Sequence, residues 1–237
     1  MATVFLRAEW KKLIMANYPV DPSALRPLLP ARTELDYWAG DAYVSLVGFQ
    51  FREVKVRGLK IPFHTNFPEV NLRFYIRYKE DTKWKRGVVF IREIVPLPAV
   101  SLVANTLFRE RYISLPMRYE ESLDGQTLKA RYQWKFKGRW NHLSATADSR
   151  SVALQPGSKE EFITEHFWGY AQTGPERTTE YQVAHPSWEV YPIQQYGIDC
   201  DFGRLYGAAF AGLETRQPQS VFLAEGSAVE VYGKNYI

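Results

Sequence analysis

Charged and hydrogen-bonding side chains alternate with apolar ones between residues 69 and 77, and this spacing is the one best suited to chemistry. The polar positions are Glu69, Asn71, Arg73, Tyr75 and Arg77. The positions between them are Val70, Leu72, Phe74 and Ile76. A carboxylate can move protons, and a guanidinium can hold a carboxylate through two parallel hydrogen bonds. A period of two predicts a β-strand with these polar groups on one face.

Two interpretations of this polar face are open. On an outer surface it would form a ladder of ion pairs, each contributing about 0–1 kcal/mol. If the face instead points into the interior of a barrel, an unpaired charge there would cost several kcal/mol. Glu69 and Arg73 would then have to be paired or bind a ligand.

The histidines and the cysteine give no sign of a metal site. The histidines stand at 64, 142, 166 and 185, with no HxH, HExxH or Cys/His spacing. His64 and His185 are candidate general bases, because the ordinary pKa of histidine suits neutral pH; the alternative for each is a structural histidine beside a proline turn. His166 is expected at a helix end, as a packing residue and a complement to the helix dipole. Cys200 lies between two aspartates, which disfavour a reactive thiolate. No phosphate-binding loop is present, and no cofactor is expected.

The rest of the sequence predicts the scaffold that must position these groups. Aromatic residues make up 15% of the chain, which favours strands. Short helices are predicted over 22–28, from 98 to 108, from 158 to before 169, and over 202–210. Hairpins are predicted over 34–56 and around the Asp124-Gly125 turn, with a closing strand over 220–231. No linker or repeat interrupts residues 1–237, so one domain is expected.

Charge and hydropathy narrow the choice of partners. The formal charge is +4, but the basic residues are spread along the chain, and a nucleic-acid partner is not expected. The longest apolar stretch, 95–108, is too short and too interrupted to span a membrane, and no membrane partner is expected. A single cysteine and no visible secretion signal predict a cytoplasmic protein.

Four motifs in order carry a family resemblance. They are F-P-E-x-N-x-R-x-Y at 67–75, a helix leading into an aromatic-proline strand at 108–117, H-P-x-W at 185–188, and D-F-G-R-L-Y-G at 201–207. Together they resemble the YqjF-like family, which is grouped by fold with acetoacetate decarboxylase, and the resemblance runs from about residue 10 to residue 206. It implies a mainly β (α+β) fold: a closed or partly open antiparallel β-barrel with a few short helices packed on it.

The resemblance also bears on the site. Acetoacetate decarboxylase forms a Schiff base through an interior lysine that follows a helix. The matching stretch here, 109–117, contains no lysine, so Schiff-base decarboxylation is not expected. Glu69 matches a strand that supplies an interior glutamate in the decarboxylase. Strand parity adds Asn71, Arg73 and Tyr75 as ligand-binding candidates.

Two further ligand-binding candidates come from the segment after the helix, Arg109 and Tyr112. Arg109 and its neighbour Arg111 could hold a carboxylate or phosphate, or could complement the helix dipole on the surface.

Three functional hypotheses follow. The first is a barrel that binds a small oxo- or carboxylic acid at a polar interior site. The second is an enzyme that acts on such an acid by acid–base catalysis, with Glu69 or His64 as the base. The third is single-stranded nucleic acid binding through the basic and aromatic residues of 129–140, although their opposite parities favour core packing. Edge-strand pairing into a homo-oligomer is compatible with all three.

Overall fold

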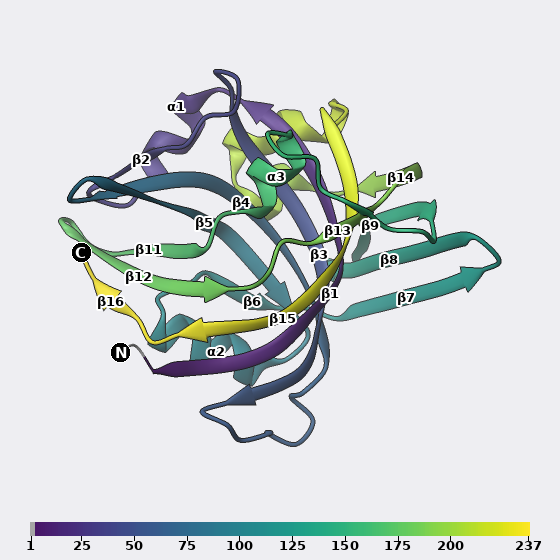
Figure 1. The fold of residues 1–237 in the computed structure, drawn as a ribbon, viewed down its shortest axis with the longest axis horizontal. Helices are drawn as coiled ribbons and strands as arrows, with labels where there is room; N and C mark the ends of the chain where they lie inside the picture. The colour runs from purple at the N-terminus through teal and green to yellow at the C-terminus, as the bar shows by residue number, and fades with distance from the viewer. Residues whose placement is uncertain (1–2) are drawn as a thin grey trace.

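Two β-sheets account for most of the chain in the computed structural model, which describes residues 3–237 (Figure 1). The larger sheet has twelve strands: β1 (Val4–Val20), β2 (Thr33–Leu35), β3 (Ala42–Val56), β4 (Phe67–Glu80), β5 (Lys83–Val95), β6 (Tyr112–Ser114), β10 (Val152–Ala153), β11 (Trp168–Gly174), β12 (Arg177–Ala184), β13 (Glu189–Tyr191), β15 (Ser220–Tyr232) and β16 (Asn235–Tyr236). The smaller has four: β7 (Met117–Asp124), β8 (Thr127–Phe136), β9 (Arg139–Asp148) and β14 (Ile193–Asp199).

The pairing of the large sheet returns to its starting strand. Its path runs β15–β1–β3–β4–β5–β11–β12, and β12 pairs again with β15 through Val183 opposite Val231. The neighbours are antiparallel except for β5, which is parallel to both β6 and β11. Because the strands run around a common interior, each has one face turned inward and one turned outward. The predicted mainly β fold is confirmed.

Short helices cover the sheets: α1 (Pro22–Leu25), α2 (Pro98–Leu107), α3 (Lys159–Thr164) and α4 (Phe202–Tyr206), with 3₁₀ turns η1 (Arg26–Leu28) and η2 (Ala208–Thr215). The predicted starts are correct, because each has a local cause. The Asp21 side chain accepts a hydrogen bond from the Ser23 N–H at 2.8 Å, and Ser158 Oγ accepts one from the Glu161 N–H at 3.1 Å. No helix in the described part of the chain is long and apolar enough to cross a membrane.

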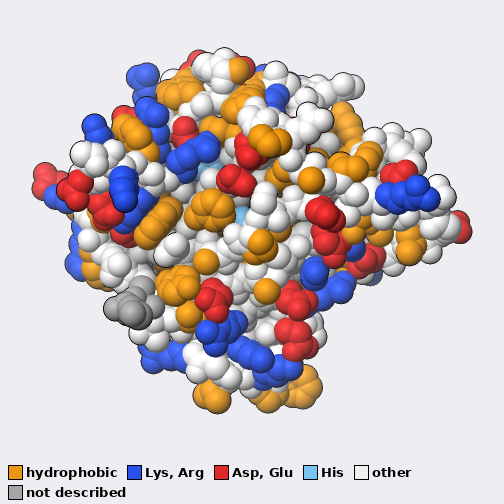
Figure 2. Space-filling model, in the orientation of Figure 1, with side chains coloured by type: hydrophobic (Ala, Val, Ile, Leu, Met, Phe, Trp, Pro, Cys, Tyr) orange, Lys and Arg blue, Asp and Glu red, His pale blue; other side chains and the backbone are white. Residues whose placement is uncertain are grey.

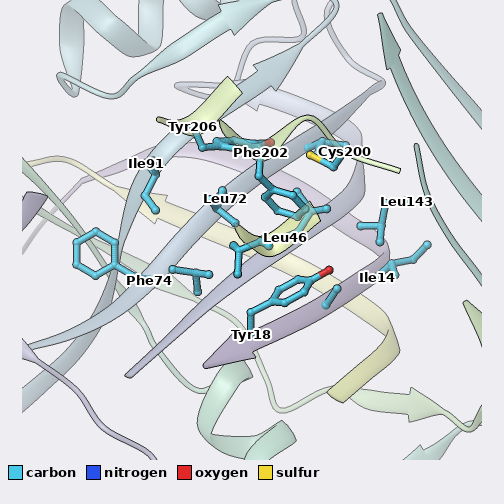
Figure 3. Close-up of a cluster of buried hydrophobic side chains, with 14 of the residues drawn as sticks. Ile14, Tyr18, Leu46, Leu72, Phe74, Ile91, Leu143, Cys200, Phe202 and Tyr206 are labelled. Carbon is cyan, nitrogen blue, oxygen red and sulfur yellow. The ribbon is translucent and has the colours of Figure 1, made fainter. Parts of the chain in front are cut away.

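The two faces of β4 belong to different interiors. Val70, Leu72 and Phe74 are fully buried in a core that the large sheet shares with the four-stranded sheet and α4. Figure 3 shows Leu72 and Phe74 in this core together with Phe202 of α4 and Leu143 of β9. The opposite face of β4 therefore points into the volume that the large sheet encloses.

The predicted hairpin over 34–56 is wrong in its pairing. β2 pairs with β4, with Leu35 opposite Ile76, and only an isolated bridge between Trp38 and Asp41 closes the turn before β3. The reason is length: β3 begins at Ala42 and reaches β4 only as far as Phe74. β2 fills the edge of β4 beyond that point.

Gly48 of β3 lies where the two sheets touch. A Cβ there would come within 2.7 Å of the Tyr132 ring. Tyr132 is fully buried, and its hydroxyl donates to the Lys12 carbonyl at 2.7 Å, so the ring has little freedom to move. The absence of a side chain at residue 48 therefore permits the close contact between the sheets.

We predict that Gly48→Ala lowers the free energy of unfolding by about 1–3 kcal/mol, because the added methyl group overpacks this contact. Urea unfolding followed by tryptophan fluorescence measures the change. Gly212→Ala is the matched control, since a Cβ at residue 212 meets no atom within 4 Å. Equal stability of both variants would contradict the proposed contact.

Candidate functional site

The large sheet encloses a cavity of about 570 Å³. This volume is typical of sites for small organic ligands. Most of its wall is apolar or aromatic, including Trp10, Phe49, Phe51, Val88, Phe90 and Trp188. Polar groups reach it mainly from β4, β5, β12 and the segment that follows α2.

β4 presents three of the predicted site residues to this cavity. Glu69, Asn71 and Arg73 line it and are 1%, 1% and 8% exposed. They do not form a solvent-exposed ladder, so the outer-face interpretation is wrong. Tyr75 shares their face but is not among the lining residues; its hydroxyl lies 2.5 Å from Ser45 Oγ. That these residues bind a ligand stays a prediction.

Glu69 is held by two donors. Asn71 Nδ2 donates to Oε1 at 2.9 Å, and the Tyr112 hydroxyl donates to Oε2 at 2.9 Å. Tyr112 is itself positioned by α2, because its backbone N–H donates to Asn105 Oδ1 at 2.7 Å. Burial raises the pKa of Tyr112 well above its ordinary value, so the phenol keeps its proton at neutral pH. The structure thus brings Glu69, Asn71 and Tyr112 together.

Two more buried glutamates line the same part of the cavity. Glu93 of β5 stands opposite Asn71 in the strand register, and Glu110 follows α2. Glu110 Oε1 accepts from the Tyr181 hydroxyl at 2.7 Å, whereas Glu93 Oε2 has no partner in the described part of the chain. We call Glu69, Glu93 and Glu110 the carboxyl cluster.

Burial is the main cause of the perturbed acidity of this cluster. It raises the pKa of Glu69 to about 7 and that of Glu110 to about 8, against the hydrogen bonds that favour the charged forms. The pKa of Glu93 is also raised well above its ordinary value, first by burial and then by the neighbouring Glu110 and Glu69. The cluster therefore holds protons at neutral pH that ordinary carboxyl groups would have lost.

Arg73 forms a second polar group at another part of the cavity. Its guanidinium donates to the Ile163 carbonyl at 3.3 Å, and Nε has no partner among residues 3–237. None of the ion pairs in the described structure includes Arg73. Arg73 lies four positions beyond Glu69 along β4, which places the two Cα atoms about 13 Å apart. The cavity thus has a cationic end near α3 and a carboxyl end near α2.

The histidines of the cavity are poor candidates for a base that works with Glu69. His64 lines the cavity, but its Nδ1 lies 2.8 Å from the Pro62 carbonyl, the structural role that was the alternative. His185 stacks on Trp188 at 4.2 Å. His166 lies beyond the end of α3, and burial lowers its pKa to about 4. The expected helix-dipole complement is wrong, because His166 is uncharged at neutral pH.

Arg109 lies apart from the other predicted site residues. It has an exposed side chain and is not among the residues that line the cavity. Its φ of +61° ends the α2 segment and turns the next residue, Glu110, into the interior. Of residues 109–111, the one that lines the cavity is therefore Glu110, an acid between two arginines.

Glu93, Glu110 and Tyr181 line the cavity as well, although they were not predicted from the sequence. The Arg-Glu-Arg run at 109–111 has the appearance of a solvated turn, and no local pattern marks its glutamate as buried. The one usable signal was Glu93, an acidic residue in the second half of β5, where the residues from 87 to 95 are apolar apart from Arg92 and Glu93. In the described residues, no group of three acidic, histidine or cysteine side chains is arranged to hold a metal ion.

The fold and cavity together define the class of protein. The structure is similar to that of acetoacetate decarboxylase from Legionella pneumophila, with a TM-score of 0.66 and 12% sequence identity over 98% of this chain and 87% of that one. It is also similar to the enduracididine biosynthesis enzyme MppR, with a TM-score of 0.69 and 14% identity over 99% and 88% of the two chains. At these identities the likeness shows the fold alone: an acetoacetate-decarboxylase-like fold.

The sequence itself shows the family. Residues 7–228 match the DUF2071 family model, "Uncharacterized conserved protein", so the chain belongs to that family. It is also 35% identical over 120 residues to "Uncharacterized protein YqjF" of Bacillus subtilis (strain 168). That match covers 50% of this chain and 48% of the YqjF protein. The predicted resemblance to the YqjF-like family and to the acetoacetate decarboxylase fold is confirmed.

The raised pKa values of the cluster predict how stability depends on pH. A carboxyl group with a higher pKa in the folded chain binds its proton more tightly there. Its contribution is complete below the unfolded value of about 4.3 and falls by about 1.4 kcal/mol per pH unit as the pH rises toward the folded value. For Glu110, whose folded pKa is about 8, the loss extends through neutral pH.

We predict that Glu110→Gln raises the free energy of unfolding at about pH 8.5 and changes it little at about pH 5, because glutamine stays neutral. Glutamine also keeps an oxygen that can accept from Tyr181. Urea unfolding across this pH range measures the slope. Glu120→Gln, which alters an exposed carboxyl group of β7, should leave the slope unchanged. An unchanged slope in Glu110→Gln would show that the Glu110 carboxyl is not held neutral.

Proposed function

We propose that the cavity binds a small oxo- or carboxylic acid, with the ligand's carboxylate on Arg73. The observation that carries this proposal is a buried guanidinium that has no ion-pair partner in the described structure. An unpaired buried charge costs several kcal/mol, and an anionic ligand would remove that cost. The free Nε of Arg73 leaves a donor for a carboxylate oxygen.

The rest of the cavity suits a ligand with an apolar body and a second polar group. The wall of the cavity around these polar groups is apolar: Phe49 lies opposite Glu69 in the strand register, and Phe90 lies opposite Arg73. At the far end, protonated carboxyl groups of the cluster can donate a hydrogen bond to a carbonyl or hydroxyl oxygen. An oxo acid with a carbon chain between its two polar groups fits this arrangement.

A structural neighbour supports the class of ligand. MppR, at 16% identity, has been solved in complex with pyruvate, which is a small oxo acid. Among the described residues, the cavity lining includes Arg57 and Arg73 but no lysine. We therefore propose non-covalent binding, without a Schiff base.

We predict that Arg73→Gln weakens binding of small oxo acids whose carbonyl lies several carbons from the carboxylate by roughly tenfold to a hundredfold, since a hydrogen-bonded charge is lost. Isothermal titration calorimetry against a panel of such acids measures the affinity. Arg77→Gln is the matched control, because Arg77 lies on the same strand, is half-buried and pairs with Glu34. If Arg73→Gln bound the acids as well as the wild type, the assignment of Arg73 would be wrong.

A second candidate function, acid–base catalysis on such an acid, rests on Glu69. Its pKa of about 7 suits a group that must take up and release a proton at neutral pH. The Tyr112 hydroxyl, which donates to the same carboxylate, is placed to donate a hydrogen bond to a developing oxyanion. We place this candidate second because the binding role needs only Arg73 and the cavity.

For this second candidate we predict that Glu69→Gln stays folded and loses at least about a hundredfold in turnover, because the amide cannot act as a base. The assay follows solvent deuterium exchange of the carbon-bound hydrogens next to the carbonyl of the same bound oxo acids, by NMR. Glu120→Gln serves again as the control. Exchange at the wild-type rate in Glu69→Gln would remove Glu69 as the base.

We also propose a reducing, cytoplasmic setting. Cys200 is the single cysteine of the sequence and is 5% exposed. Burial raises the pKa of its thiol well above the ordinary value, which keeps it unreactive. A protein of this kind needs no oxidising compartment to complete its fold.

A further inference from the structure

Exposed apolar side chains gather in two segments beside the cavity. Six of the twelve large hydrophobic side chains exposed in the described structure lie in the loop 57–66 or in α2. They are Leu59 (73%), Ile61 (47%), Phe63 (93%), Leu102 (69%), Val103 (45%) and Leu107 (41%). We call these two segments the apolar rim. A concentration of this kind marks an interaction surface more often than a free one.

The two segments lie where the cavity meets the outer surface. Ile61, Val103 and Leu107 line the cavity and are also exposed to solvent. Phe5 of β1 joins the segments: its carbonyl accepts from the Arg57 N–H at 2.8 Å, and its ring packs against Phe108 at the end of α2 at 4.9 Å. Figure 1 shows α2 and the β3–β4 loop at the same lower end of the molecule.

The charged residues within the loop of the apolar rim and just after α2 are mainly basic. Residues 54–66 contain Lys55, Arg57 and Lys60 but no acidic residue, and α2 contains no charged residue. The side chains of Arg109 and Arg111, just after α2, are exposed. Glu53 is an acidic neighbour in sequence, and it pairs with Lys60. Figure 2 shows apolar and basic side chains at this lower end, with acidic side chains beside them.

We propose that the apolar rim docks on an anionic lipid surface. Its apolar side chains would enter the boundary between headgroups and acyl chains, and the basic residues would meet the anionic headgroups. No membrane partner is expected from the sequence, because no segment could span a membrane, but peripheral docking needs no spanning segment. The proposal goes beyond ligand binding in the cavity and does not depend on it.

Charge and chemistry favour lipid over two other occupants. A second copy of this chain seated on the same face would bring two sets of basic side chains together, and like charges at an interface are unfavourable. A single-stranded nucleic acid would need ring faces for its bases to stack on. Five of the six exposed side chains are aliphatic.

The test is co-sedimentation with vesicles of about 30% phosphatidylserine in phosphatidylcholine, in parallel with pure phosphatidylcholine vesicles. The expected result is binding to the anionic vesicles that weakens as salt rises from about 0.1 M to about 0.5 M. The double variant Leu59→Ser/Phe63→Ser should lose at least about tenfold in partition, since it removes the most exposed apolar side chains. Neither residue lines the cavity, so binding of oxo acids should stay at the wild-type affinity.

Leu123→Ser is the matched control, because Leu123 is a 65% exposed leucine in the β7–β8 hairpin, away from the apolar rim. It should bind vesicles like the wild type. Equal binding of the double variant and the wild type, equal binding to neutral and anionic vesicles, or no binding at all would overturn the proposal. So would a dimer in sedimentation velocity, or affinity for a labelled oligonucleotide, that the double variant abolishes in the absence of vesicle binding.

Discussion

Burial of charge inside the large sheet is the constraint on which the rest of the structure depends. Three glutamates and one arginine lie in an interior that is otherwise largely apolar. The glutamates avoid most of the desolvation penalty of a buried charge because they stay protonated. Asn71 and Tyr112 also donate hydrogen bonds to Glu69, and Tyr181 donates one to Glu110. Arg73 cannot become neutral in the same way, because a guanidinium does not lose its proton in proteins. The buried guanidinium of Arg73 therefore lacks an anionic partner, and this is the physical basis for proposing an acidic ligand.

The scaffold holds these groups in place because β4 is fixed from its other face. Val70, Leu72 and Phe74 are fully buried against the four-stranded sheet and α4. Their alternation with Glu69, Asn71 and Arg73 means that one packed core sets the direction of every polar side chain on the strand. On the cavity side, α2 holds Tyr112 through Asn105, and the end of α3 supplies the carbonyl that Arg73 meets. The polar groups are therefore positioned by regular elements.

The same fold carries different chemistry in its structural neighbours. Structures that share only 11–16% of their residues with this chain keep the arrangement of strands, because it depends on apolar alternation and not on particular side chains. The side chains that line the cavity can change without disturbing this arrangement of strands. In this chain the segment after α2 contributes Glu110 to the interior, and no lysine lines the described cavity. Fold similarity is therefore compatible with a reaction, or a binding role, unlike that of the decarboxylase.

The sequence by itself determined the elements whose causes are local. Helix starts at Asp21 and Ser158, the turn at Asp124-Gly125, and the two faces of β4 could all be predicted, because a capping side chain, a turn dipeptide or a period of two acts over a few residues. The family resemblance added the mainly β fold. It also singled out Glu69, which does reach the cavity.

Only the tertiary structure decided which face of β4 is the inner one and what it meets there. The alternation of β4 is the same whether its polar face is wet or enclosed, and the choice depends on where the apolar face finds a core. The pairing of β2 with β4 depends on where β3 begins. Glu93 and Glu110 join Glu69 through strand register and the turn at Arg109, across separations of 24 and 41 residues along the chain. Contacts at such separations are set by the packing of whole sheets, which no local pattern records.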